Sequence, residues 1–301
     1  MRPQQKPFPK KEDIKILPLS SAIDYELFDC GGRRKLERFG KLVVDRPESE
    51  AEGPIRLAKR EWEKADWHFY EEKGKKGTWT NKSNAPENWE IGYEYHDVKL
   101  LFNLKITAFK HLGIFQEQAE NWKFMQRELT KLKGEVKVLN LFAYTGAASI
   151  VAAASGAEVT NVDSVKQVLN WGRENAEKNE VENIRWILED ARKFVKKAIR
   201  RGDKYQGIIM DPPAFGLGAK NERWKLENDL QGLLQDVVQL LHSKRHFFIL
   251  NTYSPKLPMQ KLKNMLRKID GFPDNYDSTI LGLKSNKGQQ LGLGNLVRFS
   301  K

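Results

Sequence analysis

The sequence is poor in features that identify several large protein classes. Its 301 residues include one cysteine, Cys30, so the chain can form no internal disulfide and no zinc site built from cysteines. No apolar run approaches the ~18 to 20 residues that a membrane helix needs. The N-terminus has no apolar segment after its basic residues, so no signal peptide is expected. We therefore expect a cytoplasmic protein with no membrane partner and no metal.

Acidic residues are fewer than basic residues. The chain carries 52 Lys and Arg against 40 Asp and Glu, a formal net charge of +12. Such an excess is typical of proteins that neutralise phosphates, although many basic proteins bind no nucleic acid. Hydrophobic residues make up 40% of the chain, which is enough for an ordinary folded core.

The first third of the chain predicts little helix. Residues 1–20 are rich in Pro and Lys and predict a flexible lead, whereas residues 21–97 contain short strand-like runs separated by turn residues. This pattern predicts a small antiparallel β domain, and residues 98–134 predict a helical linker that Gly134 ends. Four tryptophans of the β region either pack its small core, the favoured interpretation, or stack on bases: Trp62, Trp67, Trp79 and Trp89.

Beyond residue 134, strand-like runs alternate with amphipathic helical segments. Seven such runs occur in residues 135–301, and the last two are joined by a short link at Gly288. This alternation predicts an α/β domain with a seven-stranded, mostly parallel, Rossmann-like sheet covered by helices on both faces. One of the last two strands should be antiparallel to the rest.

Ligands of such sheets bind at the carboxyl ends of the strands, so the residues there are the candidates for a site. The first strand ends in a loop of small residues at 140–149 that contains neither the G-x-G-x-x-G nor the G-x-x-x-x-G-K-[ST] pattern. A nucleoside without phosphates therefore suits this loop better than a dinucleotide. A tight turn required only for packing would have a similar composition.

Acidic side chains end the next two strands. Asp163 can accept hydrogen bonds from two ribose hydroxyls, and Glu189-Asp190 can accept one from the exocyclic amine of adenine. Either Asp163, together with Ser164, or Asp190 could instead cap the following helix. Together, beside a loop of small residues, they favour an adenosine site.

The fourth strand ends in Asp211-Pro212-Pro213-Ala214-Phe215. Two prolines fix two φ angles and remove two N–H donors, which predicts a rigid turn lined by carbonyl groups. Asp211 and the Pro212 carbonyl could hold a planar nitrogenous group that Phe215 stacks on, such as a base taken out of its stack. The alternative is a structural proline turn with a buried Phe215.

The segments LNLFAYTGAAS, NVDSV, EDARKF and DPPAFG, in this order, resemble the motifs of class I S-adenosylmethionine (SAM)-dependent methyltransferases. More narrowly, they resemble the 23S ribosomal RNA methyltransferases that carry D-P-P-x-F. The resemblance implies SAM as cofactor and RNA, ribosomal in this family, as partner. It places cofactor-binding residues at Phe115, Glu117, Gln118, Asn140, Ala143, Tyr144, Thr145, Gly146, Ala147, Asp163, Ser164, Asp190, Ala191 and Asp211. It places the catalytic residues at Asp211, Pro212, Pro213 and Phe215.

Two departures from this pattern bear on the chemistry. Methylation of a pyrimidine at carbon 5 needs a cysteine nucleophile, but residues 251–255 after the fifth strand read NTYSP. Ala214 stands where enzymes that methylate amino groups usually carry the aromatic residue, so an exocyclic amine and a ring nitrogen such as guanine N7 both remain open as acceptors. We expect direct in-line transfer to a base. The alternatives are a protein or small-molecule acceptor, or an RNA-binding module without turnover, and the sequence does not define the oligomeric state.

A helix predicted after Asp190 carries six basic residues at helical spacing. They could follow a phosphate backbone, although a solvated helix face is the more ordinary interpretation. They are Arg192, Lys193, Lys196, Lys197, Arg200 and Arg201.

Overall fold

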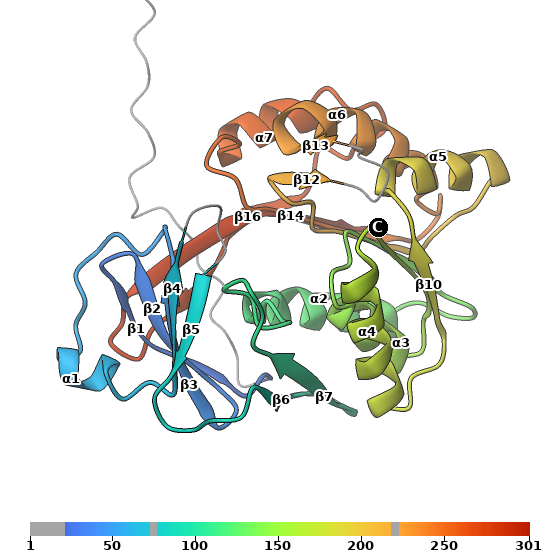
Figure 1. Cartoon of the computed structure of the whole chain (residues 1–301). Coiled ribbons are helices and arrows are strands. Elements are labelled where there is room, and N and C mark those ends of the chain that lie inside the picture. The colour runs from blue at the N-terminus through green and yellow to red at the C-terminus, as the bar shows by residue number, and fades with distance from the viewer. Residues whose placement is uncertain (1–21, 73–76, 218–222) are drawn as a thin grey trace, which may run out of the picture.

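The computed structural model describes residues 22–72, 77–217 and 223–301, so the predicted lead over 1–20 lies outside the described residues. Figure 1 shows a smaller N-terminal sheet beside a larger sheet with helices on both faces. None of the helices that the structure describes is long and apolar enough to span a membrane.

The N-terminal sheet has five strands in the order β1-β2-β3-β4-β5. They are β1 (Tyr25–Gly31), β2 (Arg34–Phe39), β3 (Leu42–Pro47), β4 (Trp67–Glu71) and β5 (Gly77–Asn81). Neighbouring strands are antiparallel except for β3 and β4, which are parallel. The expectation of a purely antiparallel sheet is therefore wrong for this pair. Parallel neighbours need a crossover connection, and the segment containing α1 (Lys59–Trp62) provides it.

The four tryptophans of this region contribute to packing rather than forming an exposed stacking surface. Trp62 and Trp67 are buried, and Trp79 and Trp89 pack partly buried against the core. Each indole N–H donates a hydrogen bond within the fold. Trp62 donates to the Asp29 carboxylate and Trp67 to the Pro86 carbonyl. Trp79 donates to the Thr107 carbonyl and Trp89 to the Phe39 carbonyl. The packing interpretation of the tryptophans therefore fits the structure.

The expected helical linker is wrong over its first eight residues. Val98–Lys105 forms strand β7, which pairs with β6 (Asn88–Tyr95) in an antiparallel hairpin. His96 in the two-residue turn has a φ of 50°, a conformation usually signalled by Asn or Gly, and the absence of that signal hides the hairpin in the sequence. The helix of the linker, α2 (Ala119–Thr130), ends four residues before Gly134.

The larger sheet has the order β10-β9-β8-β11-β14-β16-β15. Its strands are β8 (Lys137–Leu141), β9 (Glu158–Asp163), β10 (Ile184–Leu188), β11 (Gly207–Met210), β14 (Phe247–Thr252), β15 (Asp277–Lys284) and β16 (Gln290–Ser300). Only β16 runs against its neighbours, as the short connection to β15 predicts. Because the chain moves outward from β8 in both directions, the strand order reverses between β8 and β11. The site is expected at that position.

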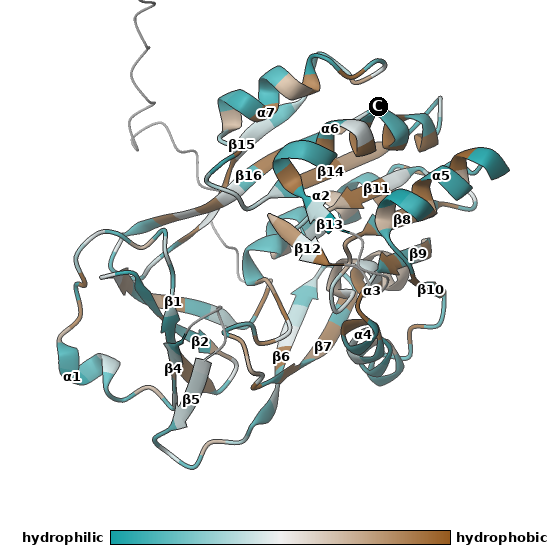
Figure 2. Ribbon diagram, turned by 45° about the horizontal axis from the view of Figure 1, so that its top comes forward, coloured by the Kyte–Doolittle hydropathy of each residue, from teal (hydrophilic) through white to brown (hydrophobic). Residues whose placement is uncertain are grey.

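Helices cover both faces of this sheet. In Figure 1, α2, α3 (Ala147–Ala154) and α4 (Lys166–Lys178) lie on one face, and α5 (Ala191–Arg201), α6 (Leu226–Val237) and α7 (Met259–Leu266) lie on the other. The apolar sides of these helices and the strands form two cores, one on each face. Figure 2 shows this division, with hydrophobic colour on the central strands and hydrophilic colour on the outer faces of α4 and α5.

The N-terminal sheet contacts the larger sheet, and the β6–β7 hairpin contacts a helix that covers the larger sheet. The turn between β15 and β16 reaches the N-terminal sheet, where the Asn286 amide donates to the Leu27 carbonyl at 3.0 Å. The β6–β7 hairpin packs on α4, where the indole of Trp171 donates to the Asn103 carbonyl at 2.9 Å. These contacts place the N-terminal sheet beside the carboxyl ends of β8, β11 and β14.

Candidate functional site

The loop after β8 has an unusual backbone. Phe142 and Tyr144 have φ values of 58° and 52°, a left-handed conformation that costs a non-glycine residue roughly 1 kcal/mol or more. Gly146, with φ 71°, leaves no room for a side chain, since a Cβ there would lie 2.9 Å from the ring of Trp186. Backbone strain of this kind concentrates at binding sites. Here the left-handed residues direct the loop so that its backbone and small side chains border the pockets described next.

Two small pockets flank Phe142. The first is lined by Phe142, Val162, Asp163, Ser164, Glu189, Asp190, Ala191, Pro213, Gly216, Leu217 and Trp224. The second is lined by Ile114, Phe115, Gln118, Trp122, Asn140, Phe142, Ala143, Tyr144, Thr145, Ala147, Ala148, Ile209 and Asp211. Together they form an elongated space across the ends of β10, β9, β8 and β11.

Asp163 holds the strained loop in place. One carboxylate oxygen accepts from the Tyr144 amide and the other from the Val165 amide, both at 2.9 Å. The residue before α4 is Val165, which makes no side-chain cap, so Asp163 does not simply cap that helix. Burial raises the pKa of Asp163. Its carboxylate borders the first pocket with acceptor capacity left for hydroxyl groups.

Asp190 does cap the next helix. Its side chain accepts from the Lys193 amide at the start of α5, and Arg192 donates to both carboxylate oxygens. The capping alternative is therefore realised, although Asp190 and Ala191 also line the first pocket.

At least three of the six basic residues on α5 form ion pairs. Arg192 pairs with Asp190 and Asp229, Lys197 with Glu189, and Arg201 with Asp203. This pattern fits a solvated helix face better than a phosphate-binding one.

The proline turn after β11 is rigid, but its aromatic residue is not where the sequence suggests. Pro212 is buried, whereas Phe215 is 55% exposed in the short strand β12 (Phe215–Leu217), which pairs with β13 (Arg223–Lys225). Trp224, 4% exposed, packs in its place and donates to the Pro213 carbonyl at 2.6 Å. The alternative of a buried Phe215 is therefore wrong, and Phe215 lines neither small pocket.

Asp211 lies at the junction of the sheet and the second pocket. Its carboxylate accepts from the Gln118 amide at 3.1 Å, and the same Gln118 nitrogen donates to the Tyr253 hydroxyl at 2.9 Å. Burial first, and the nearby Glu117 second, raise the pKa of Asp211 to about 8. The group is thus mostly protonated at neutral pH, and a pKa raised toward neutrality is typical of acid–base residues.

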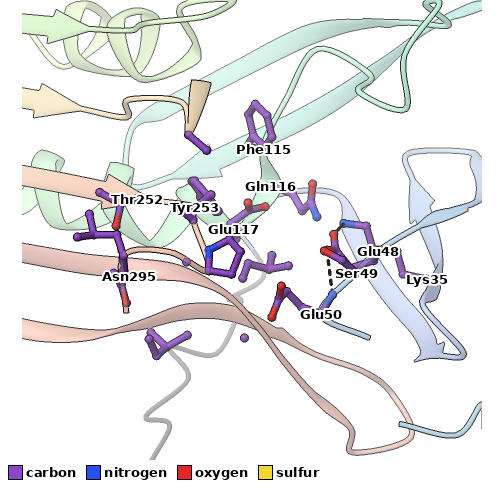
Figure 3. Close-up of a pocket in the computed structure, with 18 of the residues that line it drawn as sticks. Lys35, Glu48, Ser49, Glu50, Phe115, Gln116, Glu117, Thr252, Tyr253 and Asn295 are labelled. Carbon is purple, nitrogen blue, oxygen red and sulfur yellow. Dashed lines mark hydrogen bonds and ion pairs between the residues drawn. The ribbon is translucent and has the colours of Figure 1, made fainter. Parts of the chain in front are cut away.

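A large cavity opens beyond these residues, between the two sheets (Figure 3). The N-terminal sheet and the segments after it contribute Lys35, Arg46, Lys110 and Gln116 to the lining of this cavity. The loops that follow β11 and β14 of the larger sheet contribute Ala214 and Tyr253. Phe115 lines both this cavity and the second pocket, so the two spaces meet at its ring. Its ring lies 6.3 Å from that of Tyr253, centroid to centroid, and Glu117 points into the space beside them.

Most of the residues proposed from the sequence thus meet around the two pockets. Glu117 lies in the large cavity instead, and Gly146 supports the loop without lining a pocket. The buried Pro212 lines none of the three spaces, and Phe215 lies outside them. Tyr253 and Phe142 are absent from the sequence-based set. Tyr253 directly follows β14, so the same strand-end rule could have found it. No local sequence motif indicates that the N-terminal sheet forms one wall of the large cavity.

Comparisons with known proteins agree with this geometry. A sequence model described as S-adenosylmethionine-dependent methyltransferase matches residues 73–250, more than half of the chain. A solved SAM-dependent methyltransferase from Agrobacterium tumefaciens is 34% identical, with a TM-score of 0.87 over 94% of this chain and 92% of that one.

Curated relatives match over shorter stretches. Ribosomal RNA large subunit methyltransferase K/L of Shewanella frigidimarina is 33% identical over 144 residues, which is 46% of this chain and 19% of that protein. Ribosomal RNA large subunit methyltransferase I of Aeromonas salmonicida is 34% identical over 125 residues, 40% of this chain and 30% of that protein. The match thus spans less than a third of the length of either relative. Fold, pocket geometry, family match and the Agrobacterium tumefaciens structure agree: the chain belongs to the S-adenosylmethionine-dependent methyltransferase family.

Proposed function

We propose that this SAM-dependent methyltransferase methylates a base in RNA, with ribosomal RNA as the substrate class. The observation that carries the proposal is the junction at Phe115, where the second pocket opens into the large cavity between the two sheets. A cavity of this kind suits a base that has been taken out of its stack. The N-terminal sheet supplies the cationic residues Lys35 and Arg46 to its lining. The names of the curated relatives and the charge of +12 support RNA, and a ribosomal RNA substrate supports a cytoplasmic location.

The cofactor pockets fit an adenosyl group with a methionine tail. We assign Asp163 and Ser164 to the ribose, and Asp190 and Ala191 to the adenine, because they line the first pocket. Asn140, Ala143, Tyr144, Thr145 and Ala147, with Phe115 and Gln118, line the second pocket and suit the methionine part. SAM supplies an activated methyl group on a sulfonium. Gly146 acts indirectly, because the left-handed turn it allows brings the loop backbone close to the ligand.

The catalytic contribution of the protein is mainly orientation. Asp211 lies where the cofactor pocket meets the cavity, and the turn at Pro212 and Pro213 holds it rigidly. Fixing two reactants in line removes much of the entropic barrier to transfer. Phe215 is not part of the cavity wall, so we propose that it contacts RNA from outside the cavity, as an exposed aromatic face does with single strands.

The test is transfer of labelled methyl groups from SAM to large-subunit ribosomal RNA from cells that lack the protein, followed by mass spectrometry of the nucleosides. We expect one methylated nucleoside in the RNA fraction and a rate that falls with added salt. Asp211→Ala should lower the rate by roughly 10²- to 10⁴-fold while calorimetry still detects SAM binding. Label in protein or in small molecules, or full turnover by folded Asp211→Ala, would contradict the proposal.

A further inference from the structure

One turn of 3-10 helix, Gln116–Gln118, joins the buried carboxyl group of Glu117 to the half-buried one of Asp211. The Gln118 amide nitrogen donates to Asp211 at 3.1 Å and to the Tyr253 hydroxyl at 2.9 Å. Because that hydroxyl oxygen already accepts from Gln118, its own hydrogen is available, and Tyr253 hydrogen-bonds Glu117. Glu117 is 3% exposed. Asp211, Gln118, Tyr253 and Glu117 therefore form one connected group at the floor of the cavity.

The two carboxyl groups have unequal surroundings. Lys35 of β2 and Arg46 of β3 lower the pKa of Glu117, as does the hydrogen bond from Tyr253, although burial raises it overall. Among the described residues, Glu117 is the one charged side chain that shifts the pKa of Asp211, and it raises that pKa. The tyrosines facing the group, Tyr253 and Tyr25, have raised pKa values and stay neutral. The negative charge is thus better accommodated on Glu117, and the proton on Asp211.

We propose that Glu117, acting across Tyr253 and Gln118, is a positioning residue that keeps Asp211 able to accept a proton, and that the methyl acceptor is a nitrogen of the target base that bears a hydrogen. The inference rests on the proposed function, because it concerns the acceptor end of that site.

The proton balance distinguishes the possible acceptors. The acceptor nitrogen forms a bond to the methyl carbon, the carbon–sulfur bond breaks, and its electron pair remains on sulfur. The nitrogen loses its proton to the Asp211 carboxylate. Guanine N7 bears no hydrogen, so it would give Asp211 nothing to accept, whereas an exocyclic amino group or a ring N–H would. Carbon 5 would need a thiol, and Cys30 lies buried in the N-terminal sheet.

Asp211 needs to be ionised before it can accept the proton. A bound sulfonium favours this state because an opposite charge lowers the pKa of a carboxyl group. A nearby Glu117 anion opposes full ionisation and so maintains the basicity of Asp211. The proton acceptor would therefore operate near neutral pH, where acid–base catalysis is most effective.

Two variants test the link, and one serves as a matched control. Glu117→Gln removes the charge and keeps the shape, and Tyr253→Phe removes only the hydroxyl. Tyr205→Phe is the control, because Tyr205 is a buried tyrosine before β11, at the other end of the sheet. In the protein without cofactor, the carbon-13 NMR titration of the Asp211 carboxyl should move to lower pH by about one unit or more in Glu117→Gln. Tyr205→Phe should leave it unchanged.

Activity supplies the second readout. The pH profile of kcat should shift to lower pH in Glu117→Gln, and kcat should fall about tenfold in Tyr253→Phe, each with SAM affinity within a few fold of wild type. The methylated nucleoside should carry its methyl group on a nitrogen that bears a hydrogen before transfer. An unshifted Asp211 titration, or a product methylated on guanine N7 or on a carbon, would overturn the inference and leave RNA methylation standing. Failure of the wild-type protein to methylate RNA at all would instead overturn the proposed function.

Discussion

Two carboxyl groups near the cavity, those of Glu37 and Asp211, have opposite electrostatic surroundings. Glu37 in β2 is 0% exposed and is paired with Arg46 through two hydrogen bonds of 2.6 and 3.2 Å. Lys35 lies 3.2 Å from it, and Tyr25 and Gln116 also donate to it. The cations around Glu37 lower its pKa despite complete burial.

Asp211 has a single amide donor and an anion as its charged neighbour. Desolvation and the Glu117 charge therefore raise the pKa of Asp211 to about 8, because the hydrogen bond from Gln118 offsets only part of their effect. The comparison teaches that burial alone does not decide the role of an acid. A compensated carboxylate stabilises the N-terminal sheet, whereas an uncompensated one exchanges protons near neutral pH.

The 3-10 turn connects these two surroundings. Gln116 contacts Glu37, and two residues later Gln118 contacts Asp211. The N-terminal sheet thus takes part in forming the floor of the site as well as its wall. Changes that affect one carboxylate and spare the other can test the distinction.

The largest effect is expected at the compensated acid. Glu37→Gln leaves Arg46 and Lys35 buried without their counter-charge, so the free energy of unfolding should fall by roughly 3 to 5 kcal/mol. Denaturant titration at neutral pH measures this loss. Glu61→Gln is the control, because the Glu61–Lys64 pair lies on the surface and its loss should change stability little. Equal stability of Glu37→Gln and wild type would refute the structural role.

An effect of opposite sign is expected at the uncompensated acid. The folded protein holds the Asp211 proton up to about pH 8, whereas the unfolded chain releases it near the ordinary value of 3.8, so ionisation costs stability as pH rises between these values. Asp211→Asn removes that cost and should stabilise the protein by roughly 1 to 3 kcal/mol at pH 9 and by little at pH 4. Thermal unfolding across this pH range provides the measurement. A stability difference independent of pH would show that Asp211 is not held protonated.

The smallest effect is expected at the lone thiol. Burial and the nearby Asp29 raise the pKa of Cys30 to about 11, so it remains a thiol and a poor nucleophile. Cys30→Ser should leave methyl transfer unchanged and should cost about 1 kcal/mol of stability for burying a hydroxyl group. If the wild type made 5-methylcytidine and Cys30→Ser abolished it, the cysteine-free mechanism would be wrong.

Local patterns in the chain predict much of the larger sheet. The alternation of apolar runs and amphipathic helices from residue 135 matches the seven strands of the larger sheet, including the antiparallel β16, whereas the short β12–β13 hairpin was not predicted. Strand ends at Asp163, Asp190 and Asp211 can be read in advance because parallel strands bring their carboxyl ends to one edge. The β6–β7 hairpin could not be read in the same way, since its turn at His96 lacks the usual residues.

The sequence by itself determined the seven-strand architecture and the positions of the acids at the strand ends, because periodicity and strand polarity are local properties. Only the tertiary structure decided that Trp224 replaces Phe215 in the buried position, and that Glu117 and Tyr253 reach Asp211 from distant segments. A pKa depends on which charges and donors lie within a few ångströms, and residues 117, 211 and 253 are brought together by the packing of the whole chain.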